Sequence, residues 1–322
     1  MKLVTAFLRL IRWPNLVFIV VTQCLFYYLI TLTIFNNYTA VPVLSEKLFW
    51  FIVVSSVFIA AAGYIINDYF DLNIDRVNKP DKLVVEKIIK RRWAIVWHLV
   101  LSFAGLVIST WVCIKMFDWH TLLAGTINLL CVIALWLYST NYKRQLLIGN
   151  ILISLLTAWT ILILYVINTK SWFMTKIFYD IKHNYDMAST KLFKYAVLYA
   201  GFAFIISLIR EVIKDMEDME GDAKYGCKTM PIVWGIPATK VFTAVWLIVA
   251  VAALVIIQVY ALYLGWWWSA AYCVVTIIIP LLWILRKLYK AQVAKDYHQL
   301  STAIKLVMLA GILSMVFIKI YS

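Results

Sequence analysis

Carboxylate side chains recur at a regular spacing in the segment 67–75, which follows a long apolar run. Asp68, Asp71 and Asp75 stand at positions i, i+3 and i+7, with Asn67 immediately before them. On an α-helix, which turns about 100° per residue, this spacing places all three carboxylates on one face, with Asn67 at its edge. Clustered carboxylates repel one another, and an oxygen-only ligand set without nearby His or Cys suits Mg²⁺ better than zinc. The segment therefore predicts a site for a hard divalent cation.

The same spacing occurs a second time, in the carboxylates Asp215, Asp218 and Asp222. Glu211 lies one turn earlier on the same face of the expected helix. Glu217 and Glu220 project to the other side and are expected to be solvated. A single acidic helix end is often a solvated cap. Two with identical spacing, each at the end of an apolar span, indicate two halves of one metal–diphosphate site.

The composition is that of a multi-pass membrane protein. Of the 322 residues, 64% are hydrophobic and 14% are charged, and the mean hydropathy is +0.87, whereas soluble domains are about half apolar and a quarter charged. A bilayer span needs roughly 20 apolar residues. Nine stretches meet this requirement, at about 14–35, 47–67, 93–115, 119–139, 146–168, 192–213, 240–262, 266–288 and 301–321. The fold class is therefore predicted to be all-α.

The distribution of basic residues predicts the orientation in the membrane. The net charge is +14, and most of the 30 Lys and Arg residues fall in the N-terminus and in the connections after the second, fourth, sixth and eighth spans. The positive-inside rule assigns this side to the cytoplasm. Both acidic motifs lie on it, so we expect them at the cytoplasmic face of the cytoplasmic membrane. The first 13 residues mix basic with apolar side chains and are expected to form an amphipathic helix on the membrane surface.

Basic side chains near the motifs are candidates for binding an anionic substrate. Pro80 is expected to end the first acidic helix, which would leave Lys79 and Lys82 close to its carboxylates. Those two lysines could equally serve only as topology signals. The connection after the fourth span carries Lys143 and Arg144, which could reach a phosphate or anchor the helix end.

These features resemble the UbiA superfamily of intramembrane prenyltransferases. The similarity covers nearly the whole chain: the segment 12–15 before the first span, the NDxxDxxxD motif at 67–75, the segments 78–80 and 138–143, and the second motif at 215–222. NDxxDxxxD after an apolar span is the most specific of these signals. The segment 210–222 is most similar to the digeranylgeranylglyceryl phosphate synthases, the archaeal-lipid branch. Lys82 and Leu83 depart from the family pattern, which often has Arg-Pro there.

The resemblance implies a single prenyltransferase domain over 1–322, with nine helices around a central cavity and the acidic motifs under a cytoplasmic cap. It implies Mg²⁺-dependent transfer of a polyprenyl group, geranylgeranyl for this branch, from its diphosphate to a lipophilic acceptor, a prenylglyceryl phosphate, to form an ether lipid. The implied catalytic and metal-binding carboxylates are Asp68, Asp71, Asp75, Asp215, Asp218 and Asp222, and Asn67 would add a neutral oxygen ligand. The expected substrate-binding residues are Asn67, Arg12, Asn15, Lys79, Lys82, Tyr138, Lys143, Arg144, Arg210 and Lys214.

The sequence is also compatible with other functions. An enzyme of the same fold could prenylate an aromatic acceptor of the hydroxybenzoate or dihydroxynaphthoate type in quinone synthesis. An ion-coupled transporter would also carry intramembrane acids, but here the carboxylates stand at span ends and five spans carry almost no acid. A purely structural membrane protein gives no reason for placing five of the 16 acidic residues in 68–86 and six in 211–222.

The repeated spacing predicts that the two motifs act as a unit. Asp71→Asn and Asp218→Asn should each lower kcat by orders of magnitude and to a similar extent. The double variant should be scarcely slower than either single one, because the effects of groups that act together are not additive. Turnover of the three purified variants, with thermal unfolding in detergent measured beside it, tests this. If the losses of kcat are small and additive, and follow only the loss of thermal stability, the acidic residues have a structural role.

Overall fold

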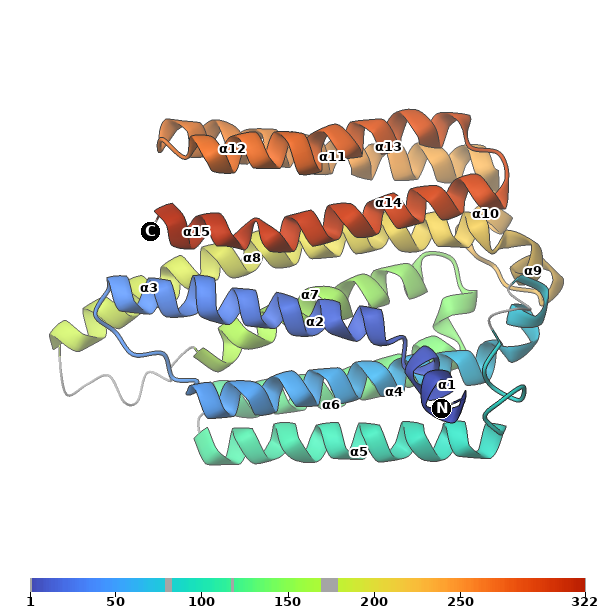
Figure 1. Cartoon of the computed structure of the whole chain (residues 1–322), viewed down its shortest axis with the longest axis horizontal. Coiled ribbons are helices and arrows are strands. Elements are labelled where there is room, and N and C mark those ends of the chain that lie inside the picture. Colours follow the sequence, from blue (N-terminus) through green and yellow to red (C-terminus); the bar gives the residue numbers. More distant parts are fainter. Residues whose placement is uncertain (1, 79–82, 117–118, 169–178, 322) are drawn as a thin grey trace. The chain divides into compact units, whose positions relative to one another are not determined.

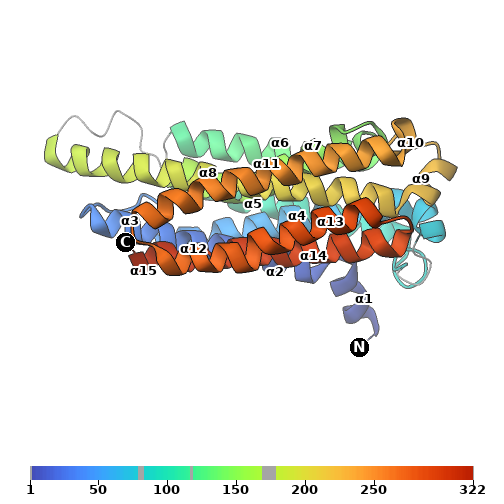
Figure 2. The same cartoon turned by 90° about the horizontal axis from the view of Figure 1, so that it is seen from above.

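The computed structural model describes residues 2–78, 83–116, 119–168 and 179–321. Over these residues the chain is helical, and its only β-type pairing is a single bridge between Val85 and Ile89. Nine helical rods in the described part are long and apolar enough to cross a membrane (Figures 1 and 2). The all-α fold class and the nine predicted spans are therefore confirmed.

Some rods are single helices and others are built from consecutive helical elements. The single helices are α4 (Glu46–Asn78), α5 (Arg91–Met116), α6 (Trp119–Thr140), α7 (Ile148–Asn168), α8 (Tyr179–Glu217) and α11 (Gly235–Tyr263). The composite rods are α2 (Trp13–Leu25) with η1 (Phe26–Thr31) and α3 (Leu32–Asn37); α12 (Trp267–Cys273) with η5 (Val274–Ile278) and α13 (Ile279–Lys290); and α14 (Ala294–Leu313) with α15 (Met315–Tyr321). Short elements are α1 (Lys2–Leu10), η3 (Tyr142–Arg144), α9 (Met219–Lys224) and α10 (Met230–Val233).

Two helices extend well beyond the predicted spans. α4 continues through the whole first acidic motif to Asn78. α8 begins at Tyr179, so part of the polar connection expected before 192 is helical. A short turn at Gly265 joins α11 to α12, with a φ of 78° that glycine adopts without a Cβ penalty. The very short connection between the predicted spans 93–115 and 119–139 includes Phe117 and Asp118, which lie outside the described residues.

The chain divides into two compact units. Unit 1 comprises residues 1–142 and 159–196, and unit 2 comprises residues 143–158 and 197–322. α7 and α8 each contribute one part to unit 1 and one part to unit 2. The first acidic motif belongs to unit 1, and the second belongs to unit 2.

α4 is the central helix of unit 1 and contacts α2, α5 and α6. Gly105 of α5 lies so close to α4 that a Cβ there would come within 2.9 Å of Ile59 Cγ1. At the same point Ser55 Oγ of α4 donates to the Gly105 carbonyl oxygen, at 2.8 Å. Membrane helices associate through such close packing and interhelical hydrogen bonds because lipid removes most of the hydrophobic driving force between them. This contact fixes the position of α4, the helix that carries the first acidic motif.

α1 packs at the end of unit 1 where α4 finishes. Figure 2 shows α1 leaving α2 at a steep angle, and Arg12 between them has left-handed φ and ψ values of 50° and 52°. The buried face of α1 joins an apolar cluster of Ala6, Leu10, Ile65, Leu72, Val84, Val85, Ile89 and Ala94. The exposed face carries Leu3, Val4 and Leu8. α1 therefore has apolar side chains on its exposed side as well as on its buried face, and an exposed apolar side suits the membrane surface predicted for this segment.

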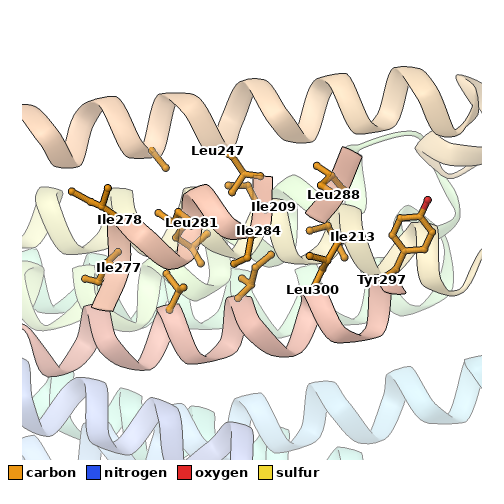
Figure 3. Close-up of a cluster of buried hydrophobic side chains, with 14 of the residues drawn as sticks. Ile209, Ile213, Leu247, Ile277, Ile278, Leu281, Ile284, Leu288, Tyr297 and Leu300 are labelled. Carbon is orange, nitrogen blue, oxygen red and sulfur yellow. The ribbon is translucent and has the colours of Figure 1, made fainter. Parts of the chain in front are cut away.

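An apolar core joins the helices of unit 2 (Figure 3). It links α8 with α11, α13 and α14 through buried side chains such as Ile213, Leu247, Leu281 and Leu300. Tyr297 extends it to the start of α14, where its hydroxyl donates to the Ala291 carbonyl oxygen at 3.3 Å. The core reaches the last turns of α8, so it holds the helix end on which the second acidic motif begins.

Gly311 of α14 and Gly201 of α8 form a matched pair for testing the packing of unit 2. A Cβ at Gly311 would lie 2.3 Å from Phe202 Cε1, whereas one at Gly201 would meet no atom within 4 Å. Gly311→Ala should lower the free energy of unfolding by about 1–3 kcal/mol, because the Phe202 ring must shift. Gly201→Ala should leave it unchanged or raise it slightly, since alanine is the better helix former. Thermal unfolding in detergent measures both. Equal stability of the two variants would contradict the close approach of α14 to α8.

Candidate active site

The first acidic motif lies on one uninterrupted helix, as its spacing predicted. α4 runs through it to Asn78, which places Asp68, Asp71 and Asp75 on successive turns. The neighbouring face of α4 is packed: Leu72 is buried and Tyr69 is partly buried in the cluster that includes α1 and the segment 83–89. This packing sets the rotation of α4 about its axis and therefore the direction of the carboxylate face.

Ion pairs join the end of α4 to the connection that follows it. Arg76 Nη2 donates to Glu86 Oε2 at 2.6 Å, and Arg91 Nη1 lies 3.8 Å from Glu86 Oε1. The Arg91 guanidinium also covers the Tyr69 ring, 4.6 Å from its centroid. Exposed ion pairs contribute little one by one, at most about 1 kcal/mol, but these share partners. Sequence reasoning did not find this network because it depends on how the segment 83–90 folds back.

Arg12 is the basic residue that the fold brings to the first motif. Its Nη2 donates to Asp68 Oδ1 at 2.6 Å, and its guanidinium carbon lies 5.2 Å from the centroid of the Tyr64 ring. The Asp68 carboxylate raises the pKa of Arg12 above its already high ordinary value. The guanidinium is therefore always charged. It stands between an acid and an aromatic face at the end of the membrane-spanning helices.

Asn67 brings a buried oxygen to the same site. Its Oδ1 accepts no hydrogen bond from the described residues. Leaving a buried polar group unsatisfied costs about 1–3 kcal/mol, so native proteins rarely do so without a reason. A hard cation, or a donor on a bound substrate, would satisfy this atom. Its chemistry fits the neutral oxygen ligand expected at this position.

The second acidic motif does not lie on one continuous helix, which corrects the prediction. α8 ends at Glu217, Asp218 is the residue just before α9 with φ and ψ of −95° and 5°, and Asp222 lies within α9. Negative charge is unfavourable at a helix C-terminus and favourable at an N-terminus. The break at Asp218 places Glu220 and Asp222 in the first turn of α9. A single helix would have kept all of this acid near its C-terminal end.

Asp215 is bound by a residue that sequence reasoning did not select. Asn150, in the first turn of α7, donates from Nδ2 to Asp215 Oδ2 at 2.8 Å. One turn earlier, Glu211 lies 2.7 Å from Arg210 Nη1 and 3.7 Å from Lys214 Nζ. Two cations proposed for substrate binding are thus engaged with an acid of their own helix. A lone Asn near the start of a span carries no periodic signal, so only the fold could identify it.

Glu217 is not solvated, and that expectation was wrong. Its Oε1 lies 2.8 Å from His298 Nδ1, and its side chain is 12% exposed. His298 belongs to α14, which packs across the end of α8. The helical-face argument could not see this neighbour, because it considered α8 in isolation. Glu220 is exposed, as expected.

The connection after α6 brings basic groups to the second motif. Arg144 accepts a backbone hydrogen bond from the Lys228 N–H at 2.7 Å, which joins this connection to the one after α9. Burial raises the pKa of the Cys227 thiol, and the nearby charge of Asp222 raises it further, whereas Arg144 and Lys143 lower it. Asp222, Lys143 and Arg144 therefore all lie within electrostatic range of Cys227 in unit 2. Lys143 is half-buried and Arg144 is exposed.

The remaining predicted residues are distributed as follows. Asn15 lies in the first turn of α2 and Tyr138 near the end of α6, both in unit 1. Lys79 and Lys82 lie outside the described residues. Within the described ranges, no three His, Cys, Asp or Glu side chains form a group that could hold a metal ion. Mg²⁺ is usually bound by one or two carboxylates together with water and substrate phosphates, so the oxygen donors present still fit it.

Comparison with known proteins identifies the family. The model of the UbiA prenyltransferase family matches residues 26–309. A protein from Methanosphaera stadtmanae called digeranylgeranylglyceryl phosphate synthase is 28% identical over 265 residues, which cover 80% of this chain and 83% of that protein. Other relatives with the same name match over between 52% and 76% of their own length.

Solved structures share the fold. One, concerned with digeranylgeranylglyceryl phosphate synthase in membranes, has a TM-score of 0.60 at 24% identity and covers 98% of this chain and 99% of that one. A UbiA homolog from Archaeoglobus fulgidus bound to GPP and Mg²⁺ has a TM-score of 0.56 at 15% identity, with 96% and 99% covered. The resemblance inferred from the two acidic motifs is confirmed: the chain belongs to the UbiA prenyltransferase family and is an integral membrane prenyltransferase.

Proposed function

We propose that this prenyltransferase transfers a geranylgeranyl group from geranylgeranyl diphosphate to a prenylglyceryl phosphate and so forms an ether lipid. The observation that carries the proposal is that each unit combines acidic and basic groups at the end of apolar helices. In unit 1, Arg12 forms an ion pair with Asp68; in unit 2, Asp222, Lys143 and Arg144 all lie close enough to Cys227 to shift the pKa of its thiol. Such ends suit substrates with an anionic head and a lipid tail. The similarity to relatives called digeranylgeranylglyceryl phosphate synthase supports the choice of acceptor.

Mg²⁺ is the proposed cofactor. Asn67 and the six motif aspartates offer only oxygen donors, which hard cations prefer. The Archaeoglobus fulgidus homolog bound to GPP and Mg²⁺ supports this choice. When bound, Mg²⁺ would stabilise the charge that develops on the leaving diphosphate as the allylic C1–O bond breaks. The carboxylates to hold it are Asp68, Asp71, Asp75, Asp215, Asp218 and Asp222.

The basic residues would bind and orient the anionic groups of the two substrates. Carboxylates alone would repel a diphosphate, so positive side chains are needed beside them. Lys143 and Arg144 act on the same thiol, that of Cys227, as Asp215 and Asp222 and are proposed to contact phosphate. Arg12 lies at the first motif and is proposed to contact the phosphate of the acceptor. Lys79 and Lys82 follow the first motif in sequence and are proposed to assist.

Aromatic and apolar side chains would protect the reactive allylic carbon. A cation formed at C1 must be shielded from water until the acceptor captures it, and aromatic faces stabilise positive charge. Tyr64 lies one turn before Asp68 and already contacts a guanidinium through its ring. The acceptor hydroxyl oxygen then forms the new C–O bond at C1 and loses its proton, while diphosphate leaves.

We further infer that the two units make one catalytic domain with a single substrate site. The family match, which extends over residues of both units, supports this inference. The acidic motifs would bind the same diphosphate on the cytoplasmic side of the membrane. The concentration of Lys and Arg in the same connections supports that orientation.

The decisive measurement is which acceptor the purified protein prenylates. Purified protein with Mg²⁺ and labelled geranylgeranyl diphosphate should convert geranylgeranylglyceryl phosphate to a labelled ether and should leave hydroxybenzoate and dihydroxynaphthoate unchanged. Exhaustive EDTA treatment should abolish turnover, and Mg²⁺ or Mn²⁺ should restore it. A labelled aromatic product would assign the protein to quinone synthesis instead. Full activity after EDTA would contradict the proposed cofactor.

Lys143 should affect binding more than chemistry. Lys143→Ala is expected mainly to raise KM for the phosphorylated substrates, whereas Asp71→Asn should lower kcat, because the aspartate is proposed to act in the transition state. Steady-state kinetics of the two variants at saturating Mg²⁺ separate these effects. A loss of kcat in Lys143→Ala as large as that in Asp71→Asn would place the lysine at the reacting atoms.

A further inference from the structure

We propose that Asn150 is a positioning residue that holds Asp215 in the orientation needed to bind the metal–diphosphate group. This inference rests on the proposed function. Asn150 is 8% exposed, and its Nδ2 donates to Asp215 Oδ2 at 2.8 Å. The hydrogen bond engages Oδ2, and in this proposal Oδ1 is the oxygen that binds the cation.

The contact belongs to a polar seam between α7 and α8. Two turns further along α7, Thr157 Oγ1 lies 3.3 Å from Ser207 Oγ, which is about two turns earlier on α8. The pairs 150–215 and 157–207 therefore match the antiparallel course of the two helices. Ser154 Oγ donates to the backbone carbonyl of Asn150 at 2.6 Å, between these two points. A seam with two interhelical contacts fixes the register of α7 against α8.

Apolar packing just before the first turn of α7 also holds this turn against α8. Leu146 and Leu147, just before the helix, pack against a buried cluster formed by Leu208, Val212 and Met230. Leu147 has a left-handed φ of 62°, which turns the chain into α7. The backbone that carries Asn150 is therefore anchored to the same helix that carries Asp215. An anchored amide can restrict the rotamers of its partner, whereas an exposed side chain cannot.

The charged residues near Asp215 explain why a neutral amide suits position 150. The cations closest in sequence, Arg210 and Lys214, are engaged with Glu211. Asn150 donates a hydrogen bond to Asp215 without bringing positive charge that would compete with a metal ion. Neutral hydrogen-bond donors behind a carboxylate ligand orient it, and their loss commonly weakens metal affinity or activity about 10–100-fold.

The test compares Asn150→Leu with Asn128→Leu. Leucine has a similar size but cannot donate a hydrogen bond. Asn128 is also a buried membrane asparagine, bonded to Ser109 at 2.7 Å and to Trp159 at 2.9 Å, but it belongs to unit 1 and is remote from both motifs in sequence. Asn150→Ser serves as a second variant, which remains polar but is too short to keep the contact.

Mn²⁺ binding is the readout, measured by EPR of the free ion in the presence of an unreactive geranylgeranyl thiolodiphosphate. Both Asn150 variants should bind Mn²⁺ about 10–100-fold more weakly. The Mg²⁺ concentration for half-maximal turnover should rise in parallel. Asn128→Leu should lower the unfolding temperature without changing either value. A merely structural role for Asn150 would change the unfolding temperature alone.

Each unfavourable outcome has a distinct meaning. If the wild-type protein fails to bind Mn²⁺ with the analogue, the proposed metal site is wrong and the inference falls with it. If the wild type binds but both Asn150 variants bind equally well, the site stands and the role of Asn150 is refuted. An equal loss in Asn128→Leu would also refute it, because the effect would then come from general loosening of the helices.

Discussion

Negative charge concentrated at the ends of membrane helices is the constraint on which the rest of this structure depends. Five of the 16 acidic residues lie in 68–86 and six in 211–222. Partly buried carboxylates are costly unless a charge or a hydrogen-bond donor compensates them. Asp68 meets Arg12, Glu211 meets Arg210, and Asp215 meets Asn150. These partners keep the acids in place, and Arg12 and Asn150 each engage one of the two carboxylate oxygens of their acid.

The two units meet this constraint in different ways. Unit 1 keeps a continuous helix, packs the face beside the carboxylates, and brings in an arginine from the turn between α1 and α2. Unit 2 breaks the helix at Asp218 and uses an amide and a histidine from other helices. The same spacing in sequence is therefore realised by two local structures.

Rigid helices position these groups. The core of unit 2 holds the end of α8, and the close contact at Gly105 holds α4. Sites built on packed helices keep their geometry better than sites on loops. Under the mechanism proposed above this rigidity matters, because an allylic cation must be shielded from water until the acceptor captures it. The acidic and basic side chains lie at the helix ends, and the bilayer-spanning parts of the helices are apolar.

The sequence by itself determined the nine spans, the helical face of the first motif and the family. All of these rest on local patterns: runs of roughly 20 apolar residues, a spacing within two turns, and short motifs in a set order. The tertiary structure alone decided the partners. Arg12 was a candidate, but its contact with Asp68 joins residues 56 apart; Asn150 and Asp215 are 65 apart, and Glu217 and His298 are 81 apart. No periodicity predicts such pairs, because they depend on which helices pack together and in which register. The helix break at Asp218 escaped prediction for a related reason, since spacing alone does not weigh the cost of acid at a helix C-terminus.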